Sequence, residues 1–268
     1  MELYYRRTGQ GEPLVILHGL YGSSDNWLTM AKRLSAEYDV IIPDLRNHGR
    51  SQHHPLHNYP QMSGDILELT DRLHIGKYHI MGHSMGGKIA VHVAARTPER
   101  LSSLTVVDIS PMNYPSLTEN SPVVTEHLNL IHTLLETDLT RFSTRASIEQ
   151  YWLQRIPAAT CRFMLKNLQQ KGKWFTWRLN LQVIARHLPY ILNGMDEFTP
   201  DRHPLIRVPS LFIKGERSDY LPDACFSLIR KIFPNSKFAV LSGAGHWLHV
   251  EQPERFYEKI SAFLKKNH

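Results

Sequence analysis

The chain has 268 residues, of which 42% are hydrophobic and 21% charged, with a formal net charge of +6. These values are typical of a folded protein with a large core, and they exclude a disordered chain and a low-complexity repeat. The basic residues are scattered and accompany no recognition motif, so we expect no nucleic-acid partner. No apolar run is long enough to span a bilayer and no signal-peptide pattern opens the chain, which predicts a cytoplasmic protein without a membrane span.

Short apolar runs alternate with stretches of helical periodicity along most of the chain. This alternation predicts an α/β fold, with a mostly parallel sheet flanked by helices. Residues 3–6 are expected to add an antiparallel strand at the sheet edge, as a hairpin partner. The expected strands are residues 14–17, 40–43, 79–81, 104–107, 210–213 and 238–241, and the expected helices are residues 27–36, 62–73, 88–96, 224–232 and 253–264.

The alternation stops between about residues 112 and 204, where helix-like segments follow one another without a β-rich run. This pattern predicts a helical cap, residues 112–204, inserted into a core of residues 1–111 and 205–268. Most apolar residues of the cap are expected to form its own core, because many recur at helical spacing. Others should roof a pocket, since ligands of open α/β sheets bind beyond the carboxyl ends of the strands.

The stretch Gly82-His83-Ser84-Met85-Gly86 fits the pattern G-x-S-x-G between an expected strand and an expected helix. In this context the pattern predicts a nucleophile elbow, a tight turn that exposes the serine hydroxyl. Glycines two residues before and after the serine leave room for the close approach of neighbouring chain segments. We therefore expect Ser84 to be a nucleophile, beside a helix N-terminus that favours developing negative charge.

A second motif, Leu17-His18-Gly19-Leu20-Tyr21-Gly22, ends an earlier expected strand. The backbone N–H of Leu20 is expected to meet the N–H of Met85, which would give the two donors of an oxyanion hole. His18 is interpreted as a hydrogen-bonded residue that shapes this loop.

Several further stretches carry a resemblance that extends over nearly the whole chain. They are residues 17–24, 44–51, 82–86, 107–111, 177–181 and 243–247. On these motifs the chain resembles the α/β-hydrolase superfamily, and within it the YbfF-like group of bacterial esterases, which is related to the abhydrolase-domain-11 proteins. The resemblance implies the α/β-hydrolase fold with an inserted cap, and a catalytic order of serine, acid and histidine along the chain.

This order requires the base to follow the last long strand, residues 238–241. His246 fits, because Gly243-Ala244-Gly245 forms a flexible loop from which its imidazole can reach Ser84. His249 is a competitor that is expected to pack in the following turn. His83 is interpreted as pocket wall or structural support, since adjacent residues on such a turn point apart.

The acid has two candidates. In most α/β-hydrolases it lies three residues after the glycine that ends the strand following the cap, but here that position holds Ser218 and Asp219 comes one residue late. Asp108, at the end of the preceding strand, is the alternative. The resemblance, through Val107-Asp108-Ile109-Ser110-Pro111, favours Asp108, with Ser218 as an additional hydrogen-bond partner near His246 and Asp219 as the alternative acid.

Two further aspartates are weaker candidates for the acid. Asp44 lies in a loop where an ion pair with Arg46 or Arg50 accounts for it, and Asp65 lies on an expected surface helix. His48, His53, His54 and His57 suggest a metal site at first sight, but no carboxylate or cysteine stands at a familiar ligand spacing. We expect a solvent-facing loop there, and we expect neither a metal nor an organic cofactor.

The chemistry expected from these residues is serine-dependent hydrolysis of a carboxylic ester or acyl thioester, acyl-CoA included, through an acyl-enzyme. The expected partner is therefore a small-molecule substrate. A carbon–carbon bond hydrolase or a perhydrolase keeps the same serine and remains an alternative. A non-catalytic binding module on the same fold is the alternative from a different class. The expected assembly is a monomer or a homodimer.

Overall fold

The computed structural model describes residues 1–111, 122–193, 195, 198–199 and 204–267. A seven-stranded sheet with the order β1-β3-β2-β4-β5-β8-β9 forms its centre. The pairs β2–β3, β2–β4, β4–β5, β5–β8 and β8–β9 are parallel, which confirms the expected α/β fold. The strands are β1 Tyr5–Thr8, β2 Glu12–Leu17, β3 Tyr38–Pro43, β4 Tyr78–His83, β5 Leu101–Val107, β8 Ser210–Gly215 and β9 Ser236–Leu241.

Strand β1 differs from the expectation in its partner. It lies at the sheet edge and is antiparallel, but it pairs with β3 rather than forming a hairpin with β2. Both edges of β2 are already paired, with β3 and β4. The connection between β1 and β2 passes against the backbone at the start of β3, and a Cβ on Gly9 would lie 2.2 Å from the Tyr38 carbonyl oxygen.

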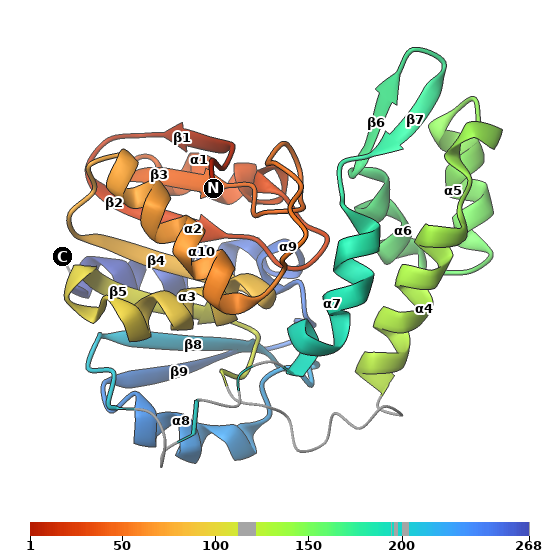
Figure 1. Ribbon diagram of the computed structural model, residues 1–268. Helices are drawn as coiled ribbons and strands as arrows, with labels where there is room; N and C mark the ends of the chain where they lie inside the picture. Colours follow the sequence, from red (N-terminus) through yellow and green to blue (C-terminus); the bar gives the residue numbers. More distant parts are fainter. Residues whose placement is uncertain (112–121, 194, 196–197, 200–203, 268) are drawn as a thin grey trace.

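Helices cover both faces of the sheet (Figure 1). One face packs on α2, α3 and α8, and the other on α1, α9 and α10. Successive side chains of β2 alternate between the two faces: Val15 and Leu17 join the first cluster, and Leu14 and Ile16 join the second. The helices are α1 Leu28–Leu34, α2 Tyr59–Arg72, α3 Met85–Arg96, α8 Phe226–Ile232, α9 Leu248–Glu251 and α10 Pro253–Leu264.

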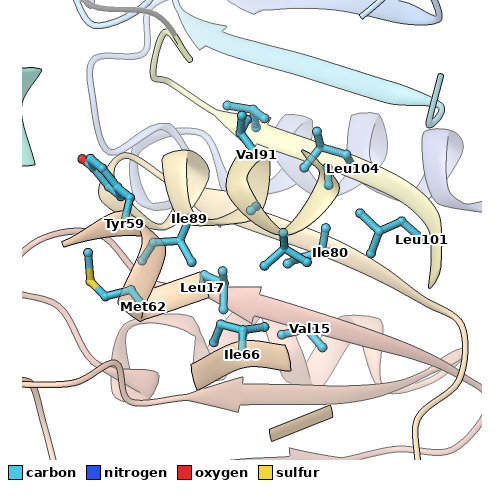
Figure 2. Packing of buried hydrophobic residues seen from close by; sticks show 14 of the residues in the cluster. Val15, Leu17, Tyr59, Met62, Ile66, Ile80, Ile89, Val91, Leu101 and Leu104 are labelled. Atoms are coloured by element: carbon cyan, nitrogen blue, oxygen red, sulfur yellow. The ribbon is translucent and has the colours of Figure 1, made fainter. Parts of the chain in front are cut away.

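Figure 2 shows the packing of the first cluster, where aliphatic side chains of the sheet meet those of α2 and α3. Val15, Leu17 and Ile80 come from the strands, and Ile66 and Ile89 come from the helices. All five are at most 1% exposed. This face of the sheet and the two helices therefore share a buried apolar layer.

A second body of structure stands beside the sheet, between β5 and β8 in the sequence (Figure 1). Its elements are α4 Pro122–Glu136, α5 Arg145–Leu153, α6 Ala158–Leu165, β6 Leu168–Lys171, β7 Trp174–Trp177 and α7 Leu181–Asn193. These elements, called the cap below, share a hydrophobic cluster of their own, in which Trp152 stacks on Trp177 at 5.5 Å between ring centroids. The expected boundary near residue 112 lies outside the described residues.

The cap also contains an element that the sequence did not predict. Strands β6 and β7 form an antiparallel hairpin where only helical segments were expected. The first strand, Leu168-Gln169-Gln170-Lys171, is too polar to be recognised as β-rich, because only Leu168 is buried in it. The turn places Gly172 at a φ of +60°, a conformation that favours glycine.

No helix in the described part of the chain is long and apolar enough to cross a membrane.

Candidate active site

Ser84 occupies a strained turn between β4 and α3, with φ 52° and ψ −121°. A Cβ on Gly82 would lie 2.1 Å from the Gly86 carbonyl oxygen, and a Cβ on Gly86 would lie 2.5 Å from that of Leu17. Real side chains do not fit at either position, which explains the two glycines of the motif. The Ser84 N–H donates to the Val107 carbonyl at 3.0 Å, so the turn lies against the end of β5.

Asp108 follows directly on β5 and is fully buried, with a φ of 53°. Its carboxylate receives three hydrogen bonds. Oδ1 accepts from the Gly215 N–H at 2.9 Å, and Oδ2 accepts from His246 Nδ1–H at 2.7 Å and from the Ser218 hydroxyl. Both carboxylate oxygens therefore serve as hydrogen-bond acceptors. The bond from Nδ1–H leaves Nε2 of His246 as the unprotonated nitrogen.

The structure therefore brings His246 and Ser218 to Asp108, while the Asp219 side chain is exposed. Ser218 contacts the acid rather than the base: its hydroxyl bonds to Asp108, and its oxygen also accepts the Tyr220 N–H at 3.3 Å. Ser218, at the sequence position of the usual superfamily acid, is therefore a hydrogen-bond donor to the carboxylate of Asp108.

The two histidines nearest to His246 are held in structural contacts. His83 is buried, and its Nε2–H donates to the His246 carbonyl at 2.8 Å. The His249 ring stacks on Trp27 with 4.3 Å between centroids. Burial holds the pKa of His83 well below its usual value and lowers the pKa of His249 to about 3, so both rings are neutral near pH 7.

Leu20 and Met85 line the same cavity as Ser84. Within the described residues, neither N–H has a hydrogen-bond acceptor. Gly86 lets the elbow approach the backbone of Leu17 and His18, which places the two loops in contact. The Met85 N–H, at the N-terminus of α3, and the Leu20 N–H, in the loop after β2, are therefore without an acceptor within the described residues.

Two buried histidines fix the loop that carries Leu20. His18 donates from Nδ1–H to the Gly19 carbonyl at 2.8 Å and accepts the Leu45 N–H on Nε2 at 2.9 Å. His48 accepts the Tyr21 N–H at 3.1 Å and donates from Nδ1–H to the Arg46 carbonyl at 2.9 Å. These hydrogen bonds are the contacts expected of a loop-shaping His18. His48 makes a second set of contacts that hold the same loop.

The expectation of a solvent-facing histidine loop was wrong for two of its members. His48 and His57 are fully buried, because the loop folds under the cap, and only His53 is well exposed. Both ring nitrogens of His48 are used in hydrogen bonds. Among the described residues, no group of three histidine, cysteine or acidic side chains is placed to hold a metal ion.

The interpretations of Asp44 and Asp65 also need correction. Asp44 accepts hydrogen bonds from the backbone N–H groups of Ser24 at 2.6 Å and Arg50 at 2.8 Å, rather than pairing with an arginine side chain. Arg46 instead forms a bidentate ion pair with Asp65, in which Nε donates to Oδ2 at 2.6 Å and Nη2 donates to Oδ1 at 2.8 Å. Asp65 is 3% exposed, so its helix, α2, presents it to the interior rather than to solvent.

The cavity at Ser84 is apolar apart from a few groups, and both the core and the cap line it. Two of its polar residues were not predicted from the sequence. They are Tyr220, after β8, and His127, on α4. Neither stands in a recognisable motif, and only the fold brings them together. The lining residues are Leu20, Tyr59, Ser84, Met85, Ile109, Val123, His127, Ile191, Leu192 and Tyr220.

This fold and site define a class of protein. Residues 12–253 match the family described as the alpha/beta hydrolase fold, and the chain belongs to that family.

Individual relatives narrow the class. The chain is 35% identical to the sn-1-specific diacylglycerol lipase ABHD11 of Danio rerio, over 96% of this chain and 80% of that one. It is 32% identical to esterase YbfF of Escherichia coli K12, over 94% and 92% of the two chains. A solved structure of a marine microorganism esterase matches with a TM-score of 0.92 and 38% identity, covering 98% of this chain and 99% of that one. The protein is thus an α/β hydrolase of the esterase and lipase type, and its expected likeness to the YbfF and abhydrolase-domain-11 proteins is confirmed.

Proposed function

We propose that the protein is a serine hydrolase that cleaves carboxylic esters or acyl thioesters through Ser84, His246 and Asp108. The observation that carries this proposal is the 2.7 Å bond between His246 Nδ1 and the buried Asp108 carboxylate, beside a serine on a strained turn. That bond orients the imidazole so that Nε2 can accept the Ser84 proton.

The reaction follows from these positions. Ser84 Oγ attacks the acyl carbonyl while His246 takes its proton, and the Leu20 and Met85 N–H groups receive the oxyanion. His246 then protonates the leaving alcohol or thiol, and the acyl group stays on Ser84. Water, deprotonated by His246, releases the acid. The Asp108 carboxylate stabilises the imidazolium in both halves of the reaction.

The apolar lining supports an acyl group as the part of the substrate that enters the cavity. Ile109 from the core and Ile191 and Leu192 from the cap contribute aliphatic surface beside Ser84. Because elements of both regions line the cavity, we assign the cap, expected over residues 112–204, the role of a lid. The basic cap residues Arg162, Lys171 and Lys173 are exposed, which fits a solvated surface as well as a contact with an anionic leaving group.

The test is hydrolysis of a series of p-nitrophenyl esters and acyl-CoA thioesters by the wild type and by Ser84→Ala. Loss of the nucleophile should lower kcat by a factor on the order of 10⁶. Comparison of the two series at equal acyl length separates ester from thioester preference. Equal rates for the two proteins would contradict the proposal. Activity confined to diketones or to peroxide would assign the site to carbon–carbon bond hydrolysis or perhydrolysis instead, and a lack of activity in every assay would favour a binding module.

A further inference from the structure

Tyr220 lies against the base of the proposed triad. Its ring stacks on the His246 imidazole with 3.8 Å between centroids and 21° between planes. This is the shortest separation among the ring pairs of the described residues that include His246, since the His83 ring is 4.6 Å away and tilted. The Tyr220 ring therefore covers one face of the imidazole.

The backbone of Tyr220 is hydrogen-bonded to two residues close to the acid. Its carbonyl accepts the Ser110 N–H at 2.9 Å, and its N–H donates to Ser218 Oγ at 3.3 Å. Ser110 is two residues after Asp108, and the Ser218 hydroxyl donates to the Asp108 carboxylate. The position of the tyrosine is thus tied to that of Asp108 through two separate contacts.

The far end of Tyr220 reaches the cap. Its hydroxyl lies 3.1 Å from His127 Nε2, on α4, and both residues line the cavity at Ser84. Burial lowers the pKa of His127 to about 4, so this imidazole is neutral near pH 7 and its Nε2 shares one proton with the phenol. A cap residue is thereby linked through one tyrosine to the base in the core.

A stacked aromatic ring has two effects on a histidine base. It restricts rotation of the imidazole away from Asp108, and its electron-rich face stabilises a cation more than a neutral ring. The imidazolium forms only when His246 has taken the Ser84 proton, so the second effect favours the transition state over the ground state. Among the described residues, the other titratable groups around His246 are the Asp108 carboxylate and the neutral imidazoles of His83, His127 and His249. The Glu251 carboxylate also lies nearby, where it accepts hydrogen bonds from the N–H groups of Gly245 and Trp247 on either side of His246.

We propose that Tyr220 is a positioning residue for His246, which holds the imidazole against Asp108 and stabilises its protonated form, and that His127 makes this support depend on the cap. The proposal rests on the proposed function for its catalytic meaning. The contact between the two rings does not depend on which substrate the enzyme takes.

The first experiment measures His246 directly. Its ring signal is assigned in histidine NMR spectra by its loss in His246→Asn, and it is titrated with pH in the wild type, Tyr220→Leu and Tyr220→Phe. Tyr220→Leu should lower the pH of half-protonation by about 0.4 to 1.5, a change of about 2- to 30-fold in the protonation constant. Tyr220→Phe keeps the ring and should titrate like the wild type. An unchanged midpoint in Tyr220→Leu would overturn the proposed support of the base, even if Ser84→Ala has shown the hydrolase function to be right.

Kinetics give a second readout. Tyr220→Leu should lower kcat more than it changes KM, with the acidic limb of the pH profile moved to lower pH. If Tyr220→Leu does not fold, Tyr220→Met, which has a side chain of similar length but no ring, takes its place in both experiments. Tyr220→Phe tests the hydroxyl alone, because it leaves the ring in place.

The link to the cap is tested by a double-mutant cycle of Tyr220→Phe and His127→Leu. Each single change should lower kcat about threefold by loss of one hydrogen bond, and the double variant should lose no more than either. The control is His132→Leu, an exposed histidine on the same helix, which should match the wild type. Additive losses in the cycle would show that His127 and Tyr220 act independently, which would overturn the dependence on the cap.

Discussion

The core and the cap of this protein are built on different principles. In the core, every residue of β3, β4 and β8 is buried, and the groups proposed for chemistry stand where strands end: Ser84 after β4, Asp108 after β5 and His246 after β9. The cap has its own hydrophobic cluster and contributes mainly aliphatic side chains to the cavity. The comparison suggests that the core carries the reaction, while the cap shapes the space in which it happens.

The two regions meet at the loop that carries the proposed oxyanion hole. Tyr21 of this loop belongs to the cap's hydrophobic cluster, and its carbonyl accepts a hydrogen bond from Asn167 Nδ2 at 2.8 Å. Asn180 is bonded twice to Asn47, from its N–H and its Nδ2, each at 3.0 Å. These hydrogen bonds therefore hold the cap next to the loop that carries Leu20. We expect a substitution that removes one of them to lower kcat.

The largest expected effect is on the core. Asp108→Asn removes the carboxylate that orients His246 and should lower kcat by a factor on the order of 10⁴. Asp219→Asn, on an exposed residue of the neighbouring loop, should stay within about twofold of the wild type, because its side chain lies at the surface. Steady-state kinetics on a p-nitrophenyl ester measure both. A severe loss in Asp219→Asn with an active Asp108→Asn would reverse the assignment of the acid.

A second effect concerns stability at acid pH. His57 is fully buried in the core, and no described residue provides a partner for either ring nitrogen. Burial lowers its pKa to about 3 from an ordinary value of 6.5. As the pH falls from 7 to 5, the unfolded chain therefore binds a proton that the folded protein excludes, and the free energy of unfolding decreases by about 2 kcal/mol from this group.

In His57→Leu, the decrease between pH 7 and pH 5 should be smaller by about 2 kcal/mol. Urea unfolding at the two pH values measures the difference. His53→Leu, on the exposed histidine of the same loop, is the control and should keep the wild-type decrease. An identical pH dependence in His57→Leu and the wild type would show that the His57 ring is not excluded from protonation in the fold.

A smaller effect is expected at the junction of the two regions. Asn167→Ala leaves the Tyr21 carbonyl without its donor and loosens the loop that carries Leu20, so kcat should fall about tenfold, with a modest loss of stability. Gln169→Ala, two residues along on β6 with an exposed side chain, is the matched control. A change confined to the melting temperature, with kcat unaltered, would separate the anchor from the oxyanion hole.

The smallest effect is expected at the tip of the cap. Trp174 is 54% exposed on the hairpin, so Trp174→Ala should change the free energy of unfolding by no more than about 0.5 kcal/mol. Trp152 is fully buried in the same cap, so Trp152→Ala should lower the free energy of unfolding by about 3 to 5 kcal/mol. A large loss in Trp174→Ala would indicate that the hairpin packs against another surface in solution.

Local features of the fold could be read from the sequence alone. The apolar runs and helical periods placed the core elements to within a few residues, because parallel strands buried on both faces must be apolar. The elbow at Ser84 was recognisable because two glycines at fixed distances from a serine meet a local steric requirement. Leu20 and Met85, whose N–H groups were predicted to form an oxyanion hole, both line the cavity at that turn.

The tertiary structure decided the contacts between residues that are far apart in the chain. It brings Asp108, Ser218 and His246 together across β5, β8 and β9, and leaves Asp219 at the surface. It pairs Arg46 with Asp65. It also stacks the Tyr220 ring on His246 and brings the Tyr220 hydroxyl to His127. Periodicity and motif spacing report on neighbours along one element, whereas each of these contacts depends on how parallel strands align their carboxyl ends and on where the cap settles over them.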